Sequence, residues 1–141
     1  MSDNELKLTR RAKVFLSLAL AAFLLGNAIA IFICYAFMTE TPSYTSENIM
    51  NPIASMAFLG TMLTFVVGCT MAAGIGNVIS IFFSSFSISF SSKAARACRH
   101  TPPCRSAKLL KPLSIVLLII SIVALLLTLP TYLLLSFFLG V

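Results

Sequence analysis

Hydrophobic positions along the chain gather in three long blocks, at 14–38, 53–90 and 112–141, and none of these blocks contains a charged residue. As a helix, the first block would be about 37 Å long, enough to cross the ~30 Å apolar core of a bilayer. The blocks are continuous rather than alternating at every second residue, which favours helices over the strands of a membrane barrel. The pattern predicts an all-α integral membrane protein.

Composition agrees with this prediction. Hydrophobic residues make up 59% of the 141 residues and charged residues 10%, against roughly 45–50% and about 25% in soluble domains. In lipid, every backbone polar group must be satisfied within a helix or a closed barrel. We therefore expect a small multi-pass protein of a cell or organelle membrane, two locations that the sequence does not distinguish.

The basic residues indicate how the chain is oriented. All ten lie in two stretches, 7–13 and 93–111, whereas the connection 39–51 carries Glu40 and Glu47 and no basic residue. Cytoplasmic loops collect Lys and Arg, and exported loops do not. This bias predicts three transmembrane helices, with the amino terminus in the cytoplasm and the carboxyl terminus outside.

The middle block leaves an alternative open because residues 53–90 would form a helix of about 57 Å, longer than a bilayer with its headgroups. A turn near residues 73–77 would divide it into two short spans, giving four in total. The other interpretation is one long or bent span, with Gly74 and Gly76 at the bend, followed by a cytoplasmic extension. We favour three spans because four would place the basic loop beside the acidic one.

The extension itself has two helical interpretations, and the alternation of residues 86–90 with period two leaves a short extended stretch as a third. Serines recur at helical spacing on one face and phenylalanines on another, as in an amphipathic helix lying at the headgroup boundary. The same residues would equally form the lower part of a long, tilted span. The serines are Ser80, Ser84, Ser87 and Ser91, and the phenylalanines are Phe82, Phe86 and Phe90.

The predicted organisation follows from these blocks. Asn51 and Pro52 have the residue types of a helix cap and a first helical position, and Pro130 should kink the last helix or end its regular part. The first block is too long for the apolar region of a signal peptide, so we expect a retained anchor. The segments are a basic cytoplasmic terminus 1–13, helix 14–38, exoplasmic loop 39–51, helix and extension 52–92, basic cytoplasmic loop 93–111 and helix 112–141.

Small residues at every fourth position predict close helix packing. Such rows let two helix backbones approach each other in lipid. The middle block carries Gly60, Thr64, Gly68, Ala72, Gly76, Ser80 and Ser84, and the first block carries Ala22, Gly26, Ala30 and Cys34. Asn27 stands beside Gly26, and its amide should find a partner in another helix. The predicted packing residues are Gly26, Asn27, Ala30, Gly60, Thr64, Gly68, Ala72 and Gly76.

The net charge of +6 indicates attraction to anionic lipid headgroups rather than to nucleic acid, since no basic surface interleaved with aromatic residues is evident. The residues expected to contact headgroups are Arg10, Arg11, Lys13, Lys93 and Arg96. Besides the bilayer, the expected partner is another membrane protein or a second copy of the chain.

Reactive groups are sparse, and we expect neither an enzyme nor a bound cofactor or metal. The single histidine, four acids and absence of a nucleophile elbow or phosphate-binding loop give no catalytic arrangement. Cys98, His100 and Cys104 match no standard zinc spacing; acylated or free thiols are the other possibilities.

The expected function is that of an accessory, assembly or structural subunit acting through helix packing. The alternative is a homo-oligomeric pore, channel or membrane-permeabilising protein whose serine stripe faces water. A transporter assembled from several copies is a third hypothesis, although internal repeats and discontinuous helices would be its usual marks.

Overall fold

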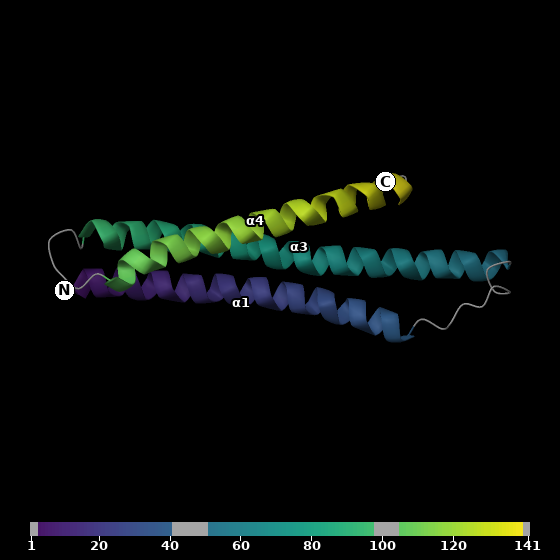
Figure 1. The fold of residues 1–141 in the computed structure, drawn as a ribbon, viewed down its shortest axis with the longest axis horizontal. Coiled ribbons are helices and arrows are strands. Elements are labelled where there is room, and N and C mark those ends of the chain that lie inside the picture. The colour runs from purple at the N-terminus through teal and green to yellow at the C-terminus, as the bar shows by residue number, and fades with distance from the viewer. Residues whose placement is uncertain (1–2, 41–50, 98–104, 140–141) are drawn as a thin grey trace.

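The computed structural model describes residues 3–40, 51–97 and 105–139, and within these ranges the chain forms three α-helices (Figure 1). They are α1 (Asp3–Glu40), α3 (Pro52–Ala97) and α4 (Arg105–Leu139). Each is long and apolar enough to cross a membrane. The prediction of an all-helical protein with three candidate spans is confirmed at this level.

The start of α3 lies where the sequence placed it. The Asn51 side-chain oxygen accepts a hydrogen bond from the Ile53 amide at 3.1 Å, and the Asn51 carbonyl accepts one from the Ser55 amide at 3.0 Å. Pro52 occupies the first helical position. The backbone N–H of any residue there lacks an acceptor within the helix, so the missing N–H of proline costs no hydrogen bond. The capping residue and the proline thus fix this end of the helix.

The long middle block is one helix without a break. α3 runs through residues 73–77, where the four-span alternative required a turn, and continues past residue 92 to Ala97. At 1.5 Å per residue it is about 69 Å long, compared with about 40–45 Å for a bilayer including its headgroups. Of the two glycines near its centre, Gly76 packs against α1, and neither opens a turn.

The last helix begins earlier than the sequence suggested. We expected it from residue 112, but α4 starts at Arg105 and passes through both Pro112 and Pro130 before ending at Leu139. Membrane helices tolerate internal proline where neighbouring groups or local adjustments satisfy the freed backbone. Helix therefore occupies both flanks of the expected basic loop 93–111, and the proline segment 101–103 lies outside the described residues.

The three helices gather at one end and spread apart at the other (Figure 1). α1 and α3 pack antiparallel, as shown by the stacked ring pairs Phe15–Phe90 and Phe37–Phe65, whose centroids lie 5.4 and 4.3 Å apart. α4 crosses α3 and diverges from it towards the carboxyl terminus. The gathered end holds the start of α1, the end of α3 and the start of α4, and with them the basic residues of these helices.

Candidate helix-packing site

The closest approach between helices joins the two small-residue rows. A Cβ atom added to Gly26 would lie 2.7 Å from the Gly76 Cα and 3.1 Å from the Ala72 carbonyl oxygen, and one added to Gly76 would lie 3.0 Å from the Ala22 carbonyl oxygen. Both glycines are buried. At this crossing, α1 and α3 meet backbone to backbone, a contact that any larger residue would prevent.

Other members of the predicted row in α3 lie elsewhere. Among the described residues, a Cβ on Gly60 would meet no atom within 4 Å, and one on Gly68 would reach only the Ile33 Cδ1 atom at 4.0 Å. The exposed Thr64 hydroxyl donates to the Gly60 carbonyl of its own helix at 2.9 Å. Ala30 does face α3, since its carbonyl accepts from the Cys69 thiol at 3.5 Å.

Helix geometry explains why the row divides. Successive residues turn by about 100°, so each four-residue step advances about 40° around the helix. The row from Gly60 to Ser84 therefore winds around α3 instead of following one side. Its second half, from Ala72 onwards, faces the neighbouring helices, whereas Gly60 and Thr64 lie on the side that α1 and α4 leave open.

Asn27 has a counterpart that the sequence analysis missed. The Asn27 amide donates to the Phe23 carbonyl at 2.7 Å and lies 3.5 Å from the Asn77 side-chain oxygen, at the outer limit of a hydrogen bond. Asn77 is fully buried. The dipeptide Gly-Asn occurs in both helices, and the close contact of the two glycines brings the two asparagines together.

Six fully buried serines form a polar line between the helices, here called the serine seam: Ser80, Ser84, Ser87 and Ser91 of α3, and Ser114 and Ser121 of α4. Two hydroxyl pairs join α3 to α4. The Ser80 and Ser121 oxygens are 2.9 Å apart, and those of Ser87 and Ser114 are 2.7 Å apart. The serine face expected to meet water or headgroups is thus enclosed by protein, and hydroxyls on α4 pair with two of its four serines.

Ser87 links all three helices. Its hydroxyl donates to the Ala12 carbonyl of α1 at 3.0 Å. Since a hydroxyl carries one proton, the Ser87 oxygen must then act as the acceptor towards Ser114. The Ser114 hydroxyl also lies 2.8 Å from the Leu110 carbonyl of its own helix, so its proton is shared between two acceptors.

Two buried polar atoms of the same region have no hydrogen-bond partner among the described residues: the Asn77 amide nitrogen and the Ser84 hydroxyl oxygen. An unsatisfied buried polar group costs about 1–3 kcal/mol in proteins. The polar core is therefore only partly satisfied, and its individual members should contribute very differently to stability.

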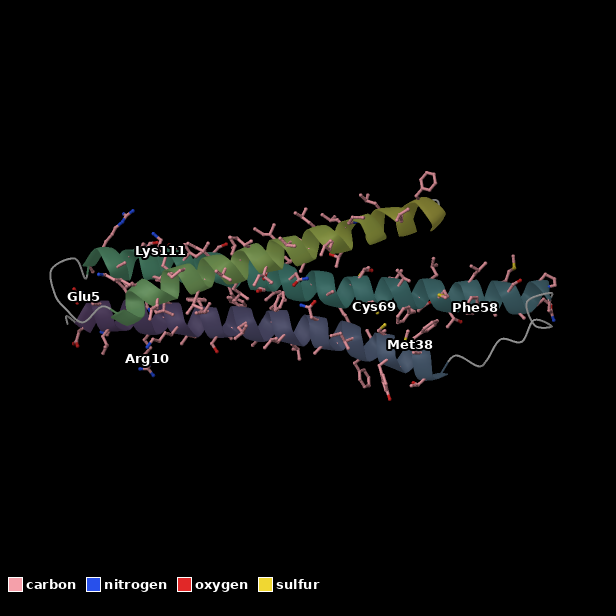
Figure 2. The ribbon with its side chains drawn as sticks, in the orientation of Figure 1. Glu5, Arg10, Met38, Phe58, Cys69 and Lys111 are labelled. Atoms are coloured by element: carbon pink, nitrogen blue, oxygen red, sulfur yellow. The ribbon has the colours of Figure 1, made fainter. Side chains whose placement is uncertain are left out.

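The residues expected to contact headgroups occupy the gathered end and are exposed: Arg10, Arg11, Lys13, Lys93 and Arg96. Figure 2 shows Arg10 extending from the outer side of α1. The Lys93 ammonium lies 5.9 Å from the centre of the Phe90 ring, within range of a cation–π contact. Beneath these cations, Phe15 contacts Phe83, Phe86 and Phe90 through its ring.

Cysteine and histidine chemistry adds little to this site. Cys98, His100 and Cys104 lie outside the described residues, while Cys34 and Cys69 are free thiols. Within the part of the chain that the structure describes, no three potential metal ligands come together.

No family model, curated protein or solved structure matches the chain.

Proposed function

We propose that this chain is a small, non-catalytic, multi-pass membrane protein that serves as an accessory, assembly or structural subunit by offering a helix face to another membrane helix. One observation carries the proposal. The small-residue row is closed by α1 around Gly76, yet its first members, Gly60 and Thr64, face away from both neighbouring helices.

Large apolar side chains surround this open part of the row. Ile53 and Met56 are each 77% exposed and Leu59 is 65% exposed. α3 also extends past the end of α1 in this region (Figure 1). A partner helix would approach the exposed Gly60 much as α1 approaches Gly76, with the adaptable Met56 side chain filling the contact.

The proposed orientation places the gathered, basic end in the cytoplasm and the spread ends on the far side. This orientation is supported by eight exposed basic residues at the gathered end, because cytoplasmic segments are enriched in Lys and Arg. The open face at Gly60 would then lie towards the exoplasmic side of the bilayer.

A pore between copies receives less support. That hypothesis relied on serines facing water, and all four serines of the α3 stripe are fully buried within a single chain. Exposing them would require α4 to leave α3, breaking the Ser80–Ser121 and Ser87–Ser114 pairs.

Replacement of Gly60 tests the proposed contact. We expect Gly60→Leu to reduce recovery of the partner in mild detergent at least about tenfold, because a leucine holds two backbones apart. Since a Cβ at this position meets no atom of the described residues within 4 Å, membrane insertion and thermal stability should not change.

The matched control is Ala28→Leu, which adds similar bulk at an exposed position of α1 and should leave recovery unchanged. Two differently tagged copies of the chain in the same membrane distinguish self-association from a separate partner. Equal recovery with Gly60→Leu and the unaltered chain would contradict the proposal.

A further inference from the structure

A groove of about 460 Å³ lies between the start of α1 and the end of α3, within the ~300–1,000 Å³ typical of ligand sites. Its α1 side carries Lys7, Arg10 and Arg11, followed by Val14 and Phe15, and Phe90 contributes the α3 side. One end of the groove is therefore cationic and the other apolar.

The polarity changes in a fixed order along the helix. Lys7, Arg11, Val14 and Phe15 follow one another at offsets of four, seven and eight residues, which share a helix face. Phe15 and Phe90 stack with their rings 4° from parallel, making a flat apolar wall directly beside the cations. An amphiphile with an anionic head and a hydrocarbon tail has this same sequence of polarities.

Charge in the groove is of one sign. Among the described residues lining it, three are cations and none is acidic. Lys93 lies against the Phe90 ring and adds a fourth positive charge at the rim. The acids Asp3 and Glu5 belong to the first turn of α1, beyond the lining residues.

We infer that this groove binds one anionic phospholipid, with its phosphate against Lys7, Arg10 and Arg11 and the upper part of an acyl chain against Val14, Phe15 and Phe90. Basic pockets between transmembrane helices are suited to such headgroups. The site is a discrete one, unlike the general attraction expected of all the basic residues. It is independent of the proposed packing face, which lies towards the opposite end of α3.

The test measures lipid retained by the full-length protein. Protein from nanodiscs of phosphatidylcholine containing a minority of phosphatidylglycerol is released into detergent, and bound lipid is counted by native mass spectrometry. We expect phosphatidylglycerol to be retained at least about tenfold over its share of the disc. A basic residue beside an anionic lipid contributes about fivefold, so Arg10→Gln with Arg11→Gln should lower retention at least about tenfold and Lys7→Gln about fivefold.

The matched control, Lys108→Gln with Lys111→Gln, removes two exposed charges from the same end of the molecule but outside the groove, and retention should change less than twofold. Equal losses in both double variants would mean diffuse surface charge and overturn the inference, as would retention without preference for the anionic lipid. Displacement of the lipid by inorganic phosphate at millimolar concentration would also overturn it, because the anion alone would then be the ligand.

Discussion

Gly26 and Gly76 set the distance between α1 and α3. The Cβ position of either residue falls 2.7 Å from the other's Cα, a separation that requires backbone rather than side-chain movement to relieve. Overpacking of this kind typically costs about 1–3 kcal/mol. Gly74 is only two residues from Gly76, yet no atom in the described part of the chain lies within 4 Å of its Cβ position, so neighbouring glycines in one helix have different roles.

We predict that Gly76→Ala lowers the thermal unfolding midpoint of the protein in detergent, because the added methyl group forces α1 and α3 apart. Gly74→Ala is the control and should leave the midpoint unchanged or raise it, since alanine favours the helix by up to about 1 kcal/mol relative to glycine. Equal midpoints for the two variants would show that the close approach does not contribute to stability.

At this scale the sequence was informative but incomplete. The four-residue spacing correctly included Gly26 and Gly76, which lie in close contact. Because the row winds around α3, Gly60 and Thr64 lie on another side of the helix and are exposed. Spacing within one helix does not specify which side its neighbours occupy. The repeated Gly-Asn dipeptide at 26–27 and 76–77 was the available signal for the Asn27–Asn77 contact.

The serine seam determines how α3 and α4 align as elements. Ser80 and Ser87 are seven residues apart, as are Ser114 and Ser121, so two antiparallel helices can form both hydroxyl pairs in one register. A seven-residue separation returns to almost the same helix face. The equal seven-residue spacing in the two helices was the signal in the sequence for these serine pairs. The serines of α3 taken alone are equally compatible with contact to water, to lipid headgroups or to another helix.

Among the seam serines, we expect unequal effects on stability. Ser87→Ala should cost about 0.6–2 kcal/mol, the range for interhelical hydrogen bonds in membranes, because it removes the contacts to Ala12 and Ser114. Ser84→Ala is the matched control. It deletes a buried hydroxyl without a described partner and should be neutral or stabilising. Unfolding with a denaturing detergent measures both, and a larger loss from Ser84→Ala would contradict the assignment.

At the scale of the whole molecule, the lengths of the apolar blocks and the positions of the basic residues together predict the number and orientation of the helices. The apolar blocks and their flanking basic residues were sufficient to predict three long helices, since each block exceeds what a bilayer requires. Sequence alone could not show that α3 remains unbroken for about 69 Å, because its serines and glycines are compatible with a turn until α1 and α4 cover them. A helix of this length must tilt or extend beyond the bilayer.

Figure 1 shows that the helical parts of both basic stretches lie at one end of the molecule, and the proposed three-span orientation requires that end to be cytoplasmic. Labelling with a membrane-impermeant thiol reagent tests this most directly. In a chain whose four cysteines are replaced, Asn51→Cys and Lys108→Cys place single thiols at exposed positions at opposite ends of the bundle. In intact cells the reagent should label the cysteine at position 51 alone, with position 108 becoming reactive only after permeabilisation. Labelling of position 108 from outside, alone or together with position 51, would contradict the three-span orientation.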